Sequence, residues 1–399
     1  MKKFLALILA LVMALSLVAC GEQKQPDNQD PDNSGDNTET TYKVAMITDY
    51  GDITDQSFNQ TTYEACKAFA EANGVDFQYF KPAGDNTADR VAMIESAIDQ
   101  GYNVIVMPGY AFGAAIAETA PNFSDVKFIA LDVSADDLGE GFVVPANLYC
   151  AVYQEELCGY MAGYAAVKLG YKNLGFLGGM AVPAVQRYGY GFVQGVDAAA
   201  AELKLTDVKL NYAYGNQFFG DADITAAMDT WYAGGTEVVF ACGGGIYTSA
   251  VDAAKKVEGA KVIGVDVDQA GVIANYAAGE GADAATIEGY KALTVTSAMK
   301  GLYPATYDTL TDVIVNGNWE KYSAKIDTLG LVSADDPAAN YVQIPMESTQ
   351  WADGAFTQDD YKALVKAMFD GTLTVSNDTT KAASDFATVI TVEDLGNIK

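Results

Sequence analysis

Short apolar runs alternate with longer segments of helical periodicity from residue 44 onward. The runs lie at residues 44–49, 77–80, 104–109, 128–132, 174–179, 210–215, 238–244 and 262–266. Between them, segments of roughly 10 to 30 residues repeat their apolar side chains about every 3.6 positions. One segment places Tyr63, Cys66 and Phe69 on a common face and stops at Gly74. Continuous apolar strands separated by helices predict an α/β fold with parallel sheets covered on both faces.

Eight such units are too many for one sheet, so the pattern predicts two doubly wound, Rossmann-like domains. The second set follows a long helical stretch at residues 154–168, and the chain continues with a strand at 293–299, a helix near 303–315 and an amphipathic segment at 361–371. We expect a return to the first domain. The predicted first lobe is 43–148 plus about 292–317, and the second is 149–291 plus about 318–399. Ligands of such sheets bind beyond the carboxyl ends of the strands, so we expect a site between the lobes.

The first nineteen residues have the pattern of an export signal. Lys2 and Lys3 precede an apolar run at residues 4–19, which is too short to span a bilayer comfortably. The run ends in Leu17-Val18-Ala19-Cys20, which resembles the lipobox of bacterial lipoproteins. That resemblance implies cleavage before Cys20 and a lipid on its sulfur. The alternative is an ordinary signal with an incidental cysteine.

A polar segment follows at residues 21–41 and contains no aliphatic or aromatic side chain. Such a segment cannot bury enough apolar surface to offset the entropy of ordering it, so we expect residues 20–42 to act as a disordered tether. The predicted product is a soluble body held to the extracytoplasmic face of the cell membrane by a lipid anchor alone.

Charge and composition narrow the classes of function. The 399 residues include 53 acidic and 24 basic side chains, giving a formal charge of −29, and no histidine. This charge repels phosphate backbones, so we expect no nucleic-acid partner. Without imidazole, the Ser-His-Asp triad, the Cys-His pair, His-ligated zinc and a histidine pH switch are all excluded.

Four cysteines follow Cys20, and none has CxxC spacing. Cysteines scattered in apolar contexts are typical of small buried hydrophobic residues, so we predict no functional disulfide. The four are Cys66, Cys150, Cys158 and Cys242.

The first apolar run leads into a polar loop at residues 48–60. Ser57 with Gln60 three positions later fits a capping box, which predicts a helix beginning at Phe58. Phe58 and Asn59 would then lie in the first turn, facing the cleft. The ordinary alternative for such a phenylalanine is a hydrophobic staple or a core anchor.

This loop resembles the opening motif of the basic membrane protein (BMP) family, bacterial lipoproteins that serve as substrate-binding components of ABC importers and commonly bind purine nucleosides. The matching residues are Asp49, Gly51, Asp55, Ser57, Phe58 and Asn59, with Asp52 where the family usually has a second glycine. Residues 174–196, 214–221, 238–245, 262–269 and 296–300 resemble further family motifs in the same order. The resemblance implies a type I periplasmic-binding-protein fold, an ABC permease as partner and no chemical step. We expect a monomer.

The resemblance also implies how the cleft holds a nucleoside. Two aromatic rings can clamp a flat base. Phe58 is expected to supply one ring, and Phe219 the other from the opposite lobe, with Phe218 and Tyr188 as alternatives.

The polar contacts follow from the same resemblance. Asp132 matches the position that accepts hydrogen bonds from the purine edge, Asp266 the position that receives the ribose hydroxyls, and Lys300 the position that donates to them. Asn59 and Asp49 are expected to add polar contacts. The turn around Gly244 allows close approach of the backbone.

Other functions are open at this point. Residues 243–248 followed by Asp266 imitate a dinucleotide fingerprint, which would indicate an NAD-dependent enzyme. A sugar-binding or autoinducer-binding protein, or an adhesin, could share the fold. Asp49, Asp52 and Asp55 do not have the spacing of a calcium loop. We predict a binding protein with no catalytic residue, no metal and no cofactor.

Overall fold

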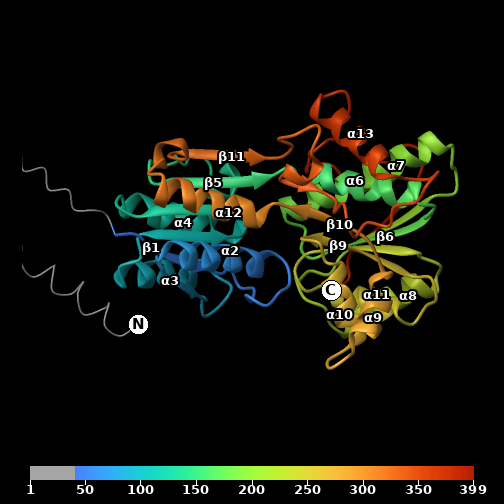
Figure 1. Cartoon of the computed structure of the whole chain (residues 1–399), viewed down its shortest axis with the longest axis horizontal. Coiled ribbons are helices and arrows are strands. Elements are labelled where there is room, and N and C mark those ends of the chain that lie inside the picture. The colour runs from blue at the N-terminus through green and yellow to red at the C-terminus, as the bar shows by residue number, and fades with distance from the viewer. Residues whose placement is uncertain (1–40) are drawn as a thin grey trace, which may run out of the picture. The chain divides into compact units, whose positions relative to one another are not determined.

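The computed structural model describes residues 41–399, and residues 42–399 form one compact unit (Figure 1). The expected signal peptide, the lipidated Cys20 and the tether up to residue 40 lie outside the described residues. No helix within the described part of the chain is long and apolar enough to cross a membrane.

Six parallel strands form the sheet of the first lobe, in the order β11-β5-β4-β3-β1-β2. They are β1 (Lys43–Ile47), β2 (Asp76–Phe80), β3 (Val104–Pro108), β4 (Lys127–Leu131), β5 (Leu148–Tyr153) and β11 (Lys325–Leu329). The helices around them are α2 (Phe58–Asn73), α3 (Thr87–Asp99), α4 (Gly113–Thr119), α5 (Ala135–Leu138) and α12 (Leu302–Leu310).

Both faces of this sheet are covered, as the continuous apolar runs predict. In β1, Val44 and Met46 belong to a core that includes Phe69 of α2. The intervening residues Ala45 and Ile47 belong to a second core that includes α3 and α4. Side chains of a strand alternate between faces, so a strand buried on both faces is apolar throughout.

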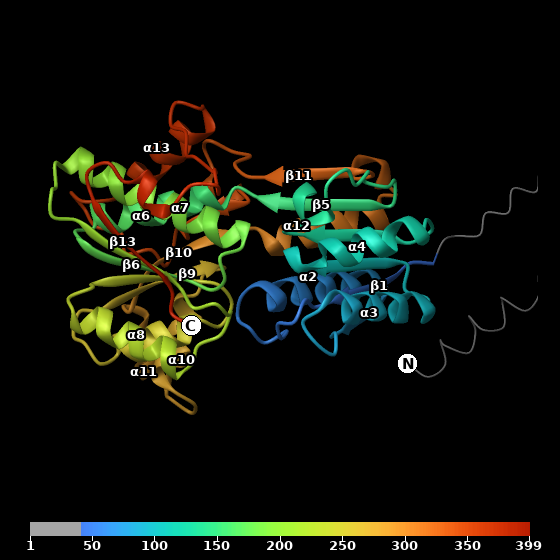
Figure 2. The ribbon, with the colours of Figure 1, turned by 180° about the vertical axis from the view of Figure 1, so that it is seen from behind.

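Seven strands form the sheet of the second lobe, in the order β12-β10-β9-β8-β6-β7-β13. Every pair is parallel except β10 with β12. The strands are β6 (Asn173–Gly178), β7 (Lys209–Tyr214), β8 (Val238–Cys242), β9 (Lys261–Asp266), β10 (Thr294–Lys300), β12 (Val342–Gln343) and β13 (Thr391–Asn397). The helices are α6 (Glu155–Lys168), α7 (Pro183–Leu203), α8 (Ala222–Ala233), α9 (Tyr247–Ala254), α10 (Ala270–Ala278), α11 (Ala284–Lys291) and α13 (Gln358–Phe369). Figure 2 shows α6 and α7 on one side of this sheet and α8, α10 and α11 on the other.

The strand pairing corrects the predicted lobe boundaries in three places. Strand β10 was expected in the first lobe but pairs with β9 and β12 in the second sheet. Strand β5 runs past the predicted boundary at 148, and β11 was expected in the second lobe, yet the two pair in the first sheet. The sheet to which β10 or β11 belongs depends on pairing between residues far apart in sequence. The polar sequence of β11 (KIDTL) also does not indicate a strand. The expected helix near 303–315 forms as α12 and a π-helical turn, and its Tyr307 packs on Phe69 of α2.

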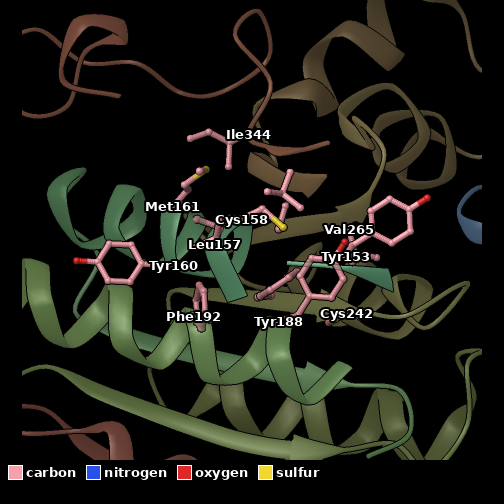
Figure 3. Close-up of a cluster of buried hydrophobic side chains, with 14 of the residues drawn as sticks. Tyr153, Leu157, Cys158, Tyr160, Met161, Tyr188, Phe192, Cys242, Val265 and Ile344 are labelled. Carbon is pink, nitrogen blue, oxygen red and sulfur yellow. The ribbon is translucent and has the colours of Figure 1, made fainter. Parts of the chain in front are cut away.

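Helices α6 and α7 pack with their backbones in contact, and glycines make this possible. A Cβ on Gly159 or Gly163 of α6 would lie 2.2 or 2.3 Å from a backbone oxygen of α7. A Cβ on Gly191 or Gly195 of α7 would lie 2.1 Å from a backbone oxygen of α6. Figure 3 shows the side chains around this contact, including Cys158 of α6 and Phe192 of α7. Cys66, Cys150, Cys158 and Cys242 are all buried, which confirms that they act as small hydrophobic residues.

We expect Gly191→Ala to lower the free energy of unfolding by about 1–3 kcal/mol, because the added methyl group must push the two helices apart. Gly289→Ala in α11 is the matched control, since a Cβ there meets no atom within 4 Å. Chemical denaturation of both variants measures the difference. Equal stability of the two would contradict the close-packing account.

Candidate functional site

A cavity of about 480 Å³ lies between the two lobes. Its volume is in the range of small-molecule sites. All eight residues predicted as ligand contacts line it: Asp49, Phe58, Asn59, Asp132, Phe219, Gly244, Asp266 and Lys300. They come from the carboxyl ends of strands in both sheets and from the start of α2, as parallel α/β sheets require. The structure therefore brings the predicted residues together around one cavity.

Helix α2 begins at Phe58, as predicted, but the predicted capping box is wrong. The carboxylate of Asp55 accepts hydrogen bonds from the backbone N–H groups of Ser57 at 2.9 Å, Asn59 at 2.9 Å and Gln60 at 3.0 Å. Ser57 makes no capping bond, and its hydroxyl donates to Asp266 of the other lobe at 2.5 Å. The capping-box pattern predicted that Ser57 caps α2, whereas Asp55 does so. The sequence does not show that Ser57 bonds instead to Asp266, which is distant in the chain.

The other two acids of this loop also have structural partners. Asp49 Oδ1 accepts the backbone N–H groups of Tyr50 at 2.6 Å and Gly51 at 2.7 Å, and burial raises the pKa of Asp49. Asp52 pairs with Lys81 at 2.5 Å. Backbone N–H groups thus hold Asp49 and Asp55, and Lys81 holds Asp52, while the Asn59 side chain interacts with both Asp49 and Asp55. Asn59 donates to Asp55 at 3.1 Å, and its buried Oδ1 has no partner among the described residues.

Asp132 and Asp266 occupy equivalent places in the two lobes, directly after β4 and at the end of β9. Both have left-handed backbone angles, with φ of 58° and 64°. Such angles are uncommon for residues other than glycine and occur often at functional sites. Burial raises the pKa of Asp132 to about 6, although the positive charge and the hydrogen bond of Lys300 both act to lower this pKa. Asp132 lines the cavity, and its buried Oδ1 finds no hydrogen-bond partner within residues 41–399.

Lys300 lies at the centre of the site. Its Nζ is 2.5 Å from Asp132 Oδ2, 3.4 Å from Glu155 Oε1 and 3.9 Å from Asp266 Oδ1. Burial alone would lower the pKa of Lys300, but these carboxylates raise it overall, so the ammonium is charged at neutral pH. The same Nζ lies 4.7 Å from the centre of the Phe58 ring.

Several bonds in this cluster join the lobes. Lys300 of the second sheet reaches Asp132 of the first, and Ser57 of the first lobe reaches Asp266 of the second. Gln269 Nε2 adds a hydrogen bond to the backbone oxygen of Gln56 at 3.1 Å. The residues that line the cavity therefore also link its two walls.

Glu155 and Arg187 complete the cluster, and the sequence analysis missed them. Glu155 is fully buried at the start of α6, and its Oε2 lies 2.6 Å from Arg187 Nε of α7. Acidic residues are common in the first turn of a helix because they interact favourably with the helix dipole. The position of Glu155 in the sequence therefore did not indicate a functional role. Arg187 offered a signal, because it is one of only two arginines in the chain and stands in an apolar helix.

The aromatic candidates differ in their surroundings. Phe219 is 59% exposed at the cavity wall. Phe218 packs against Gly179 and Gly243, and its ring centre lies 6.2 Å from that of Tyr50. Tyr188 is 2% exposed and its hydroxyl donates to Asp266 at 3.2 Å. Among these three rings Phe219 is the most exposed, and its pairing with Phe58 around a ligand stays a prediction.

The glycine-rich turn at 243–245 packs against Phe218. A Cβ on Gly243 would lie 2.7 Å from the Phe218 ring, and a Cβ on Gly244 would lie 2.8 Å from the Phe218 backbone oxygen. Gly244 also has a φ of 49°. Gly243 and Gly244 are therefore required by the packing of Phe218, which explains this glycine-rich turn without a dinucleotide.

Comparison with known proteins gives an independent assignment. A profile of the Bmp family, described as "ABC transporter substrate-binding protein PnrA-like", matches residues 42–340. The "ABC transporter nucleoside-binding protein BmpA" of Lactococcus lactis is 28% identical over 67% of this chain and 75% of its own length. An uncharacterized lipoprotein of Pyrococcus horikoshii is 28% identical over 83% of this chain and 76% of its own length.

Solved structures agree on the fold. An ABC transporter solute-binding protein from Aeropyrum pernix has a TM-score of 0.63 at 20% identity, covering 86% of this chain and 90% of its own. A solute-binding protein from Conexibacter woesei has a TM-score of 0.60 at 23% identity, covering 84% and 99%. These neighbours confirm the predicted two-lobed, type I binding-protein fold. With the profile covering most of the chain, the protein belongs to the Bmp family of ABC transporter substrate-binding proteins.

Proposed function

We propose that this protein captures a purine nucleoside between its lobes and delivers it to an ABC importer at the extracytoplasmic face of the membrane. The observation that carries the proposal is that Phe58 and Asp132 line the same cavity, and that Asp132 Oδ1 has no hydrogen-bond partner among the described residues. A purine presents both a flat face for the ring and N–H donors for the carboxylate. The name of the Lactococcus relative supports the same ligand class.

The remaining groups suit the sugar. A ribose offers vicinal hydroxyls that can donate to Asp266 and accept from Lys300, which lie 3.9 Å apart. Asn59 and Asp49 line the same cavity and are expected to supply further polar contacts. Stacking between Phe58 and Phe219 then uses one ring from each lobe.

Capture between two lobes explains how a permease could distinguish the loaded protein from the empty one without any chemical step. A ligand favours the closed form only by its greater affinity for that form. Contacts split between Asp132 in one lobe and Asp266 in the other exist together only when the lobes are close. The permease would then recognise the closed, loaded protein, which we expect to act as a monomer.

Calorimetric titration tests the ligand class. A ligand of roughly 20 heavy atoms at about 0.3–0.5 kcal/mol each gives a dissociation constant between tens of micromolar and tens of nanomolar. We expect adenosine, guanosine or inosine to bind in this range, and ribose and glucose to bind far more weakly. Tighter binding of glucose than of every nucleoside would contradict the proposal.

Asp132→Asn tests how the base is recognised. The variant keeps one acceptor oxygen but loses the charge, so we expect the preference among adenosine, guanosine and inosine to flatten while the protein stays folded. Asp229→Asn, which changes an acid paired with Lys256 outside the cavity, is the matched control. An unchanged order and spread of affinities in Asp132→Asn would remove Asp132 from base recognition.

Cys20→Ser tests the proposed anchor. The residue lies outside the described part of the chain, and its role rests on the lipobox-like sequence. We expect the variant to leave the membrane fraction and appear as released protein after cell fractionation. Retention in the membrane fraction would contradict lipid attachment at this cysteine.

A further inference from the structure

The last part of the chain lies beyond the family profile but is built into the second lobe. The profile ends at residue 340, whereas the structure continues through α13 to β13. Strand β13 extends the sheet as a parallel neighbour of β7, with Thr391 opposite Lys209 and Asn397 opposite Tyr214. The backbone N–H of Ile398 then donates to the Tyr214 oxygen at 2.8 Å. The chain therefore follows β7 up to the point where β7 enters the loop at residues 215–221.

Lys399 contacts this loop on both sides of its two phenylalanines. Its Nζ forms an ion pair with Asp221 and lies 3.4 Å from Gln217 Oε1. Gln217 in turn donates from Nε2 to the Phe219 backbone oxygen at 2.9 Å and to Asp221 Oδ2 at 2.7 Å. Asp221 also caps α8, accepting from the backbone N–H of Ile224 at 3.0 Å. One lysine is thus joined to the residues that flank Phe218 and Phe219.

The position of the Phe219 ring depends on its backbone. The side chain is 59% exposed, so neighbouring side chains hold it only weakly. Its backbone oxygen is held by Gln217, and Gly245 bridges to Phe219 as an isolated parallel pair. Hydrogen bonds that order this loop before a ligand arrives reduce the entropy lost on binding.

We propose that residues 391–399 act as a brace that orders the loop at residues 215–221 through Lys399, Gln217 and Asp221, and so positions Phe219 for the ligand. Lys399 is a positioning residue and does not line the cavity. The ordering of the loop at residues 215–221 does not depend on the proposed function. The expected effect on nucleoside affinity rests on the proposed function.

Hydrogen exchange of the ligand-free full chain tests the brace first. We expect faster amide exchange at residues 215–221 in Lys399→Gln, with exchange in α6 unchanged. Lys256→Gln is the matched control, because it removes the same charge from a surface pair with Asp229 at 2.7 Å. Lys399→Arg should restore slow exchange. Unchanged exchange of the loop in Lys399→Gln, or equal changes in Lys256→Gln, would overturn the brace.

Titration with inosine then tests the consequence for Phe219. We expect Lys399→Gln to bind roughly two- to five-fold more weakly than the unaltered protein, the range of an exposed ion pair, with Lys256→Gln unchanged. Faster loop exchange with unaltered affinity would overturn the positioning of Phe219. If the unaltered protein binds no nucleoside, the proposed function fails, while the exchange measurement still decides whether the brace exists.

Discussion

Replacing Lys300 with methionine is expected to lower the free energy of unfolding by about 3–5 kcal/mol at pH 7, because Asp132 and Asp266 lose the cation beside them, whereas Glu155 keeps Arg187. The side chain of Lys300 is 3% exposed and lies within 4 Å of Asp132, Glu155 and Asp266. Lys168→Met is the matched control. Lys168 forms one ion pair in the described part of the chain, with the half-exposed Glu202, so its loss is expected to cost under about 1 kcal/mol. Chemical denaturation of both variants measures the contrast.

The penalty of Lys300→Met is expected to be smaller at pH 5 than at pH 7. Burial raises the pKa of Asp132 to about 6 even beside Lys300, and loss of the ammonium raises it further. In the unfolded chain an aspartate has a pKa of about 3.9. A carboxyl whose pKa is higher than this in the folded protein contributes stability below about pH 4. That contribution is lost as the pH rises through the folded-state pKa. An equal penalty at both pH values would contradict a cost that arises from the Asp132 charge.

Phe58→Ala is expected to weaken binding of a purine nucleoside by about 1–3 kcal/mol, or roughly 5- to 160-fold, through loss of one stacking face. Phe58 sits in the first turn of α2, at the cavity wall, with Lys300 4.7 Å from its ring centre. Calorimetry with inosine measures the loss.

Two variants control for effects other than stacking. Phe58→Trp keeps an aromatic face and is expected to retain most of the affinity. Phe369→Ala removes an exposed ring on α13, away from the cavity, and is expected to leave binding unaltered. Full affinity in Phe58→Ala would remove this ring from the ligand contact.

The two-lobed architecture could be predicted because its signal is local. Strands such as β3 and β8 are buried on both faces and therefore read as uninterrupted apolar runs. Acids at or directly after the ends of such strands, like Asp266 and Asp132, meet at the carboxyl ends of the sheets. The predicted residues consequently line one cavity.

What could not be predicted depends on partners distant in sequence. Strand β13 is mostly exposed and acidic, and only its pairing with β7 makes it a strand. Ser57 has a local sequence context that suits a helix cap, yet it bonds to a residue 209 positions away. Burial of the Glu155 carboxylate is favourable only because Arg187 and Lys300 lie beside it, and neither contact can be read from the sequence. Local patterns carry none of these contacts.

A crystal structure of the protein soaked with inosine tests the central claim most directly. The account predicts a hypoxanthine ring stacked on Phe58, with its edge at Asp132 and its ribose hydroxyls at Asp266 and Lys300. An empty cavity at saturating inosine, or a nucleoside bound with its ribose against Phe58 and its base away from Asp132, would contradict it.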